Sequence, residues 1–231
     1  MPERVASKQR PRGSQGAAGD RPRPLVVAVP KGRVLEQLIP RLQAAGIDGA
    51  PLSAKSRQLI REDRRHGIRY LLLKPDDVPT YVEYGAADLG VVGRDVLLER
   101  DYDLYAPVDL GIGRCRMMVC GRGPEDLERV YARPLRVATK FPNIARAHFE
   151  ARGRSIETVF AQGSVELAPL TGLADVIVDL VETGETLRQN GLQELEKVVD
   201  ISSVVVVNRA ALKLERDRIV PLLEAFGRTG E

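Results

Sequence analysis

Residues 172–191 read GLADVIVDLVETGETLRQNG, and this stretch sets the expected fold. The run VIVDLV is the apolar pattern of a buried strand, and the segment that begins at ETLRQNG has the composition of a helix. Between them the strand ends in two acids, Asp179 and Glu182, followed by a Thr-Gly-Glu-Thr turn. A buried strand that leads through a short turn into a helix is the unit of an α/β protein.

An earlier segment repeats this one. GAADLGVV from Gly85 and GLADVIVD from Gly172 share the pattern Gly-x-Ala-Asp followed by an apolar strand. Each copy is followed by a matching strand pair, PVDLGIGRCRMMVCG in the first half and KVVDISSVVVVNR in the second. LVVAVPKGR and LRVATKFPN likewise begin the two halves as strand and loop. The chain therefore reads as two α/β halves built alike.

We expect two lobes joined by those strand pairs as crossovers. Lobe I would comprise residues 25–113 and 203–231, and lobe II residues 114–202, with residues 1–24 as a basic tail. Short strands that alternate with helices predict a largely parallel sheet covered on both faces. The last helical pattern, ALKLERDRIVPLLEAF, would close back on lobe I. Ligands of such folds bind between the lobes, at the carboxyl ends of the strands.

Composition narrows the class of protein. The 231 residues are 43% hydrophobic and 4% aromatic with no Trp, which argues against a stacking platform for single-stranded nucleic acid. Six basic and two acidic residues lie in residues 1–24, so the remainder, with 29 basic and 30 acidic residues, is close to neutral. We therefore expect a disordered basic tail and no nucleic-acid partner. The sequence contains no run of 18 apolar residues, so we expect no membrane span. It also contains no apolar core of the kind that a secretory signal requires, so we expect no secretory signal.

The two cysteines, Cys115 and Cys120, lie on one expected strand, RCRMMVC. Side chains five residues apart on a strand point to opposite faces, so these two thiols cannot pair with each other. Two thiols without a disulfide framework are typical of a reducing cytoplasm.

A basic loop follows the first strand. Lys31, Gly32 and Arg33 lie between that strand and a helix, whose N-terminus carries unpaired N–H groups and about half a positive charge. Together with two cationic side chains this favours a phosphate or pyrophosphate. A solvated basic turn is the alternative.

The turn at residues 183–186 has the same position in lobe II. Gly184 permits a tight backbone, and Thr183 and Thr186 add hydroxyl donors to the N–H groups of a helix start. Asp179 and Glu182 would repel a phosphate, so they either accept hydrogen bonds from sugar hydroxyls or hold a metal that bridges phosphates. This combination describes a ribose 5-phosphate. A plain Thr N-cap is the alternative, but it does not explain an acid at the end of a buried strand.

These residues resemble the short form of ATP phosphoribosyltransferase, the first enzyme of histidine biosynthesis. The most specific match is GSVELAPLTGLADVIVDLVETGETLRQNGL at residues 163–192, supported by VPKGR, SRQLI, KPDDVPTYVEYGAADLGVVG and ATKFPNIARAHF. The resemblance spans about residues 25–226. It implies a periplasmic-binding-protein-like (type II) α/β fold with two lobes, two crossover strands and an interlobe cleft.

The resemblance also implies a reaction and its residues. ATP and phosphoribosyl pyrophosphate would give N1-(5-phosphoribosyl)-ATP and pyrophosphate, with Mg²⁺. Lys31, Arg33 and Arg57 would surround the triphosphate or the departing pyrophosphate, with Arg33 and Arg57 in the catalytic role. Asp88 and Glu166 would face the cleft, although Asp88 could equally cap a turn. The residues expected to bind substrate are Lys31, Gly32, Asp88, Gly163, Ser164, Glu166, Asp179, Glu182, Thr183, Gly184, Glu185, Thr186 and Leu187.

Displacement at the anomeric carbon needs cations near the leaving group rather than a strong base, because adenine N1 already carries a lone pair. We accordingly expect His66, in the charged turn REDRRHG, and His148, in a helical segment, to be solvated rather than catalytic. Asp76 and Asp77 are open between two readings, as helix-start acids or as acids that line the cleft.

Two other functions share parts of the pattern. A purine-salvage type phosphoribosyltransferase has a similar loop, but it carries adjacent acids where Leu180 follows Asp179, and it lacks duplicated lobes. A two-lobed anion-binding protein without catalysis shares the architecture, but it would not need the basic residues Lys31, Arg33 and Arg57 together with the threonine loop.

Partners follow from the resemblance. The long form of the family carries a C-terminal histidine-binding domain, whereas this sequence ends at Glu231, soon after the closing helix. The short form implies a separate regulatory subunit related to histidyl-tRNA synthetase, in a cytoplasmic hetero-oligomer. Which carboxylate contacts Mg²⁺ is not fixed by the motifs.

Overall fold

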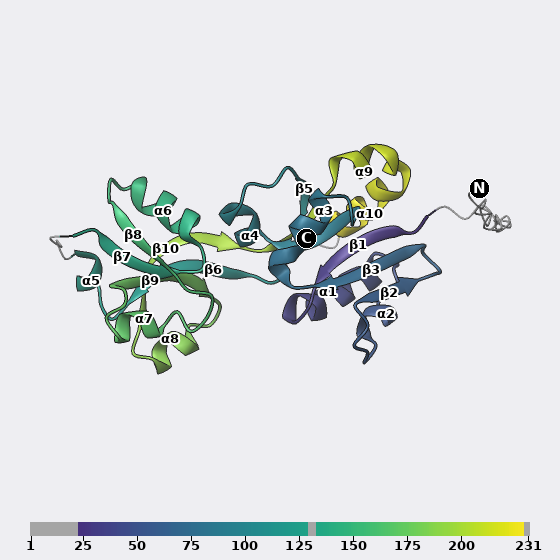
Figure 1. The fold of residues 1–231 in the computed structure, drawn as a ribbon. Helices are drawn as coiled ribbons and strands as arrows, with labels where there is room; N and C mark the ends of the chain where they lie inside the picture. Colours follow the sequence, from purple (N-terminus) through teal and green to yellow (C-terminus); the bar gives the residue numbers. More distant parts are fainter. Residues whose placement is uncertain (1–22, 129–132, 229–231) are drawn as a thin grey trace, which may run out of the picture.

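The computed structural model describes residues 23–128 and 133–228. It consists of two lobes, each built on its own sheet, and two neighbouring passages of the chain link them (Figure 1). The expected two-lobed α/β architecture is confirmed. None of the helices within the described ranges is long and apolar enough to cross a membrane.

Lobe I contains a six-stranded sheet in the order β2-β3-β1-β4-β11-β5. Strand β1 runs parallel to β3 and β4, whereas β11 runs antiparallel to both β4 and β5. The strands are β1 (Leu25–Pro30), β2 (Ile60–Asp63), β3 (Ile68–Leu73), β4 (Leu89–Gly93), β5 (Tyr105–Asp109) and β11 (Ser203–Val207).

Lobe II contains a five-stranded sheet in the order β10-β6-β9-β7-β8. Strand β7 runs parallel to β8 and β9, whereas β6 runs antiparallel to both β9 and β10. The strands are β6 (Cys115–Gly121), β7 (Leu135–Thr139), β8 (Ile156–Phe160), β9 (Val176–Val181) and β10 (Gln193–Ile201).

Both sheets are mixed, so the prediction of a largely parallel sheet is wrong. Each sheet keeps three parallel strands, β3-β1-β4 and β8-β7-β9, and adds antiparallel strands where the chain crosses between lobes; in lobe I a further antiparallel strand, β2, pairs with β3 at the other edge. The chain leaves lobe I after β5 and returns through β11, which runs against β5, while β6 and β10 form the matching antiparallel pair in lobe II. Figure 1 shows these passages side by side at the junction of the lobes.

Helices cover both faces of each sheet. The helices of lobe I are α1 (Arg33–Ala44), α2 (Ala50–Ser53), α3 (Val78–Glu83), α4 (Arg94–Glu99), α9 (Arg209–Leu214) and α10 (Arg216–Arg228), with a 3₁₀ turn at Pro75–Asp77. Those of lobe II are α5 (Glu125–Glu128), α6 (Pro142–Glu150), α7 (Leu167–Leu170) and α8 (Glu185–Gln189).

Alternate strand residues therefore enter different cores, which explains the continuous apolar runs. In β1, Val27 and Val29 join one core and Ala28 joins the other. In lobe II, Cys115 packs against one core and Cys120 lies in the other, so the expected opposite orientation of the two thiols is confirmed.

The C-terminal segment is two helices rather than the single helix expected. Helix α9 ends at Leu214 and α10 begins at Arg216, because the backbone of Glu215 leaves helical geometry. Ala211, Ile219 and Phe226 are buried in the lobe I core, so the prediction that this segment closes back on lobe I is confirmed.

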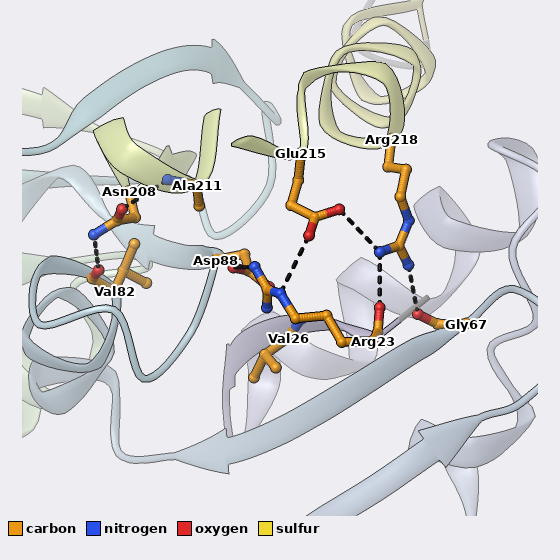
Figure 2. Close-up of polar contacts among 9 residues, drawn as sticks. All are labelled: Arg23, Val26, Gly67, Val82, Asp88, Asn208, Ala211, Glu215 and Arg218. Carbon is orange, nitrogen blue, oxygen red and sulfur yellow. Dashed lines mark hydrogen bonds and ion pairs between the residues drawn. The ribbon is translucent and has the colours of Figure 1, made fainter. Parts of the chain in front are cut away.

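Asp88 does not face the cleft, and that expectation is corrected. It precedes β4, at the edge of the sheet opposite the loops that follow the strands. Its carboxylate, 5% exposed, accepts hydrogen bonds from Arg23 at 2.9 and 3.1 Å and from the Val26 backbone N–H at 2.8 Å. Figure 2 shows this cluster, in which Glu215 also pairs with Arg23. Arg23 is thus part of lobe I, and the boundary expected for the basic tail is corrected there; residues 1–22 lie outside the described residues.

Lobe II repeats the same contact. Asp175 precedes β9 and accepts hydrogen bonds from Arg133, at 2.8 Å to each oxygen, and from the Arg136 backbone N–H at 2.8 Å. The local motifs are the same in both lobes, because Arg-Pro-Leu leads into β1 and into β7, and Gly-x-Ala-Asp lies directly before β4 and before β9. The Gly-x-Ala-Asp repeat therefore marks a structural ion pair, not a ligand contact.

Replacing Asp88 with Ala should lower the free energy of unfolding by about 2 kcal/mol, because it leaves the Val26 N–H and Arg23 without their acceptor. Urea unfolding followed by circular dichroism measures the loss. Asp77→Ala is the matched control, since Asp77 is exposed and makes no capping hydrogen bond; it should change stability by less than about 0.5 kcal/mol. Equal losses in the two variants would contradict the role assigned to Asp88.

Candidate active site

The two loops singled out in the sequence meet across the cleft. Arg33 begins α1, directly after the loop that leaves β1, and Glu182 directly follows β9. Their guanidinium and carboxylate groups form an ion pair between the lobes. The contact arises because the carboxyl ends of the parallel strands of both lobes carry these loops. The basic loop and the acid-threonine loop are therefore facing walls of one site.

The lobe I wall is a tight turn that opens a helix. Gly32 has φ +90°, a conformation that L side chains rarely adopt, and its carbonyl accepts hydrogen bonds from the N–H groups of Leu35 and Glu36. The Lys31 side chain is exposed, while its N–H donates to the Leu73 carbonyl of β3 at 2.9 Å. The turn thus aims Arg33 at lobe II and leaves Lys31 in the solvent.

The lobe II wall is a pocket of about 230 Å³. Gly184 adopts left-handed geometry with φ +73° and precedes α8, and the Thr183 hydroxyl accepts a hydrogen bond of 3.3 Å from the Glu185 N–H. The N-cap of α8 is Gly184, which has no side chain to cap the helix, so Thr183 is not the N-cap of the alternative reading; its hydroxyl makes a turn contact two residues along and lies in the pocket lining. The lining residues are Glu166, Asp179, Leu180, Val181, Glu182, Thr183, Gly184, Glu185, Thr186 and Leu187.

Two members of the loop direct their side chains elsewhere. The Glu185 carboxylate pairs with Arg188 and accepts a hydrogen bond of 2.9 Å from Gln189, and these contacts lower the pKa of this exposed group. Leu187 is 5% exposed and packs in the lobe II core. Neither side chain is therefore directed at a ligand in the pocket, and Leu187 would contribute its backbone N–H.

The GSVE segment (residues 163–166) directly precedes α7 and contributes one residue to the pocket. Glu166 lines the pocket, whereas Gly163 and Ser164 are exposed in the preceding loop. Ser164 has φ +49°, and among the described residues it is the one non-glycine residue with a positive φ. Left-handed geometry in a residue other than glycine costs free energy and tends to be kept at functional sites.

Asp179 is the acid with a perturbed environment. Burial raises the pKa of its carboxyl above the usual range; the nearby Glu166 also raises it, while Lys140 and a hydrogen bond of 2.8 Å from the Leu180 N–H act against the rise. A half-buried acid at the end of a strand, beside a second acid, is suited to accept hydrogen bonds from hydroxyl groups of a ligand.

A second contact joins the lobes, and its lobe II side was not predicted from the sequence. Lys140, which directly follows β7, lies 2.7 Å from Asp76 of lobe I. Of the two readings left open for Asp76, the structure supports the cleft-lining one, while Asp77 is exposed. Lys140 could have been found by its position, since it follows a strand of the repeat as Lys31 does.

Glu99 reinforces this second contact. Its carboxylate accepts hydrogen bonds from the N–H groups of Asn143 (3.0 Å) and Ile144 (3.1 Å), at the first turn of α6 in lobe II. Helix α6 has no side-chain cap from its own cap residue, so lobe I supplies it. No local signal could predict a cap that comes from the other lobe.

Arg57 is exposed in the segment between α2 and β2. That segment lies at the carboxyl edge of the lobe I sheet, because the Leu59 carbonyl accepts a hydrogen bond from the Leu72 N–H near the end of β3. Arg57 therefore comes to the same edge as Lys31 and Arg33, without lining the lobe II pocket.

Neither histidine is simply solvated, which corrects that expectation. His66 places Nδ1 2.6 Å from Asp63. His148 is 8% exposed on α6, 3.3 Å from Glu196, and burial lowers the pKa of its imidazole. Neither residue lines the lobe II pocket, so both are held in structural contacts.

Comparison with known proteins decides the family. The family model described as ATP phosphoribosyltransferase (HisG) matches residues 74–228. The chain belongs to the ATP phosphoribosyltransferase family. It is 57% identical to the ATP phosphoribosyltransferase of Sorangium cellulosum over 202 residues, 87% of this chain and 94% of that protein. It is 54% identical to that of Halorhodospira halophila, over 87% of this chain and 94% of the relative.

Comparison with solved structures gives the same family. The chain is similar to one from the ATP phosphoribosyl transferase (HisG:HisZ) complex of Thermotoga maritima, with a TM-score of 0.74, 35% identity and coverage of 89% of this chain and 98% of that one. The BvgS VFT2 domain of Bordetella pertussis gives a TM-score of 0.56 at 12% identity, over 87% and 86%, and shares the fold alone.

Family membership confirms that the chain is an enzyme, a pentosyltransferase of histidine biosynthesis. The purine-salvage reading is set aside by the family match. The alternative of a binding protein without catalysis is supported only by the shared two-lobed architecture, which the BvgS domain also has.

The raised pKa of Asp179 predicts a pH-dependent cost to stability. A carboxyl whose pKa is higher in the folded than in the unfolded chain favours folding when protonated, and this contribution is lost as the pH rises through the folded-state pKa. Asp179→Asn removes the charge and keeps an acceptor for the Leu180 N–H. Its Tm at pH 7.5 should exceed that of the unmodified protein by roughly 2–4 °C, and the gain should shrink towards about pH 4.

Glu185→Gln is the matched control in the same loop. The pKa of Glu185 is lowered by Arg188, so removing this charge should leave the Tm at pH 7.5 unchanged or lower. Differential scanning calorimetry across pH separates the two. A lower Tm for Asp179→Asn at neutral pH would contradict the assignment of a desolvated carboxylate.

Proposed function

We propose that this chain transfers the 5-phosphoribosyl group from phosphoribosyl pyrophosphate to N1 of ATP and releases pyrophosphate, with the residue roles given below. Family membership supports the reaction. The observation that carries the residue assignment is the ion pair between Arg33 and Glu182, because it brings a cationic loop and a threonine loop to facing sides of one cleft.

The lobe II pocket suits the ribose 5-phosphate. The phosphate would accept hydrogen bonds from the N–H groups of Gly184, Thr186 and Leu187 and from the hydroxyls of Thr183 and Thr186. The Thr183 hydroxyl uses an oxygen lone pair for the Glu185 N–H, so its own hydrogen is free to donate. Asp179, Glu182 and Glu166 would accept hydrogen bonds from the ribose hydroxyls.

The lobe I wall suits the polyphosphate. Lys31, Arg33 and Arg57 lie at the carboxyl edge of its sheet and would stabilise the negative charge that grows on the departing pyrophosphate. Glu182 forms an ion pair with Arg33 in this structure. When substrate enters, this pair would break, and the Glu182 carboxylate would accept hydrogen bonds from the ribose hydroxyls instead. Closing the lobes would hold adenine N1 opposite the leaving group, and this positioning supplies much of the rate.

Mg²⁺ enters this proposal with the phosphates. Among the described residues, no group of three or more His, Cys, Asp or Glu side chains is arranged to hold a metal ion. We therefore do not propose a magnesium site made of protein side chains alone. Glu166 and Asp179 offer the oxygen donors that Mg²⁺ prefers once substrate phosphates complete its coordination. The ion would offset phosphate charge, while the orientation of the substrates falls to the chain's own side chains.

Arg33→Gln should lower kcat about 10²- to 10³-fold, on the scale of losing one group that stabilises transition-state charge. The assay is pyrophosphate release from ATP and phosphoribosyl pyrophosphate with Mg²⁺. Arg209→Gln is the control, since it removes an exposed lobe I ion pair with Asp103 and should keep activity within about twofold. Absence of pyrophosphate from the unmodified chain, even with a regulatory subunit added, would refute the proposed reaction.

We also propose a regulatory partner of the HisZ type, related to histidyl-tRNA synthetase, and a cytoplasmic hetero-oligomer. The similar Thermotoga maritima structure is a HisG:HisZ complex. The free thiols of Cys115 and Cys120 fit a reducing compartment.

Histidine should inhibit the isolated chain weakly and inhibit the complex with its HisZ-type partner at least about tenfold more strongly, a coupling free energy of about 1.4 kcal/mol. Initial rates at increasing histidine, with and without the partner, measure the difference. Equal inhibition of the chain alone would assign histidine binding to this chain instead.

A further inference from the structure

Glu182 is held from two sides. Its carboxylate pairs with Arg33 of lobe I, and its backbone carbonyl accepts a hydrogen bond of 3.1 Å from Nη1 of Arg116. Arg116 lies on β6, opposite Val181, the residue that precedes Glu182 on β9. Arg116 is thus the neighbour of the point at which the strand ends and the loop begins.

The rest of the Arg116 guanidinium is used by Glu194 of β10. Nε donates to Oε2 at 2.8 Å and Nη2 donates to Oε1 at 2.5 Å, a two-pronged ion pair between half-buried side chains. Each of the three guanidinium nitrogens therefore has a protein partner, and the charge of Arg116 is balanced. This arrangement distinguishes Arg116 from Lys31 and Arg57, whose side chains are exposed to the cleft edge.

Glu194 also supports the turn itself. A Cβ added to Gly184 would lie 3.0 Å from Oε1 of Glu194, so the carboxylate packs directly beneath the glycine. The ion pair therefore meets the loop at two points, through a hydrogen bond to the Glu182 carbonyl and through packing of the Glu194 carboxylate against Gly184. Helix α8, which follows, has five residues and gives the loop little rigidity of its own.

We propose that Arg116 and Glu194 are positioning residues, which set the geometry of residues 182–187 for the ribose 5-phosphate without touching it. This inference rests on the proposed function, in which that loop binds the phosphoribosyl donor. The pair is built on β6 and β10, the two strands that continue into the crossings to lobe I. The loop is consequently tied to the same strands that join the lobes.

Three substitutions separate this role from general stabilisation. Arg116→Gln removes the fork and should raise the KM for phosphoribosyl pyrophosphate about tenfold while the KM for ATP stays within about twofold. Arg116→Lys keeps the charge, but a single ammonium cannot bond Glu182 and both Glu194 oxygens together, so its effect should be intermediate. Glu194→Gln keeps one acceptor and should raise the same KM about threefold.

The measurements use the full chain with its regulatory subunit, with pyrophosphate release as the rate and calorimetric titration with phosphoribosyl pyrophosphate as the binding readout. Because the two residues act as one unit, the double variant Arg116→Gln/Glu194→Gln should be no worse than about twofold beyond Arg116→Gln alone. Lys197→Gln is the matched control: it removes an ion pair with Asp200 on the same strand β10 and should leave both KM values unchanged.

Each outcome is informative. Equal rises of both KM values, or a fall in kcat alone with donor binding unchanged, would overturn the positioning role. If Arg116→Gln does not fold, as judged by its Tm, Arg116→Lys and Glu194→Gln decide by the same criterion. A complex of unmodified chains that releases no pyrophosphate would instead refute the proposed function, so the two failures are distinguishable.

Discussion

The site depends on one electrostatic contact, the ion pair between Arg33 and Glu182. Each residue comes from a loop at the carboxyl end of a parallel strand, and the two crossings place those strand ends face to face. Without this ion pair, the Arg33 guanidinium and the Glu182 carboxylate would be unpaired charges of opposite sign on the two walls of the cleft. Opposite charge on the facing walls draws the lobes together, and in the proposed function the substrate phosphate would compete for the same cation.

The two edges of each sheet serve different purposes. At the amino edge both lobes carry the same contact, Arg23 with Asp88 and Arg133 with Asp175, and each fixes the start of two neighbouring strands. At the carboxyl edge the lobes differ, with a basic turn in lobe I and an acid-threonine turn in lobe II. The duplicated framework is therefore kept where it stabilises the fold, and the lobes diverge where ligand chemistry is needed.

Several parts of the site were predictable because their signals are local. The strand-loop-helix units that carry Arg33 and residues 182–187 follow from apolar runs and turn residues. Asp88 was placed at the cleft because the family resemblance was taken to imply it, although a residue directly before a strand lies at the edge opposite the loops that follow the strands. Glu99, Lys140, Arg116 and Glu194 were missed because each has its hydrogen-bond or ion-pair partner at least 44 residues away in sequence.

The sequence by itself determined the duplicated α/β halves, the basic and acid-threonine loops and, through its motifs, the family, since periodicity and turn chemistry are properties of neighbouring residues. The tertiary structure decided the mixed strand order, the break at Glu215, the buried environment of Asp179 and the pairing of Arg116 with Glu194. These features arise from strand register and from contacts between distant segments. Burial and distance exist only once the two lobes are assembled, and they fix both the pKa of an acid and the partner of a cation.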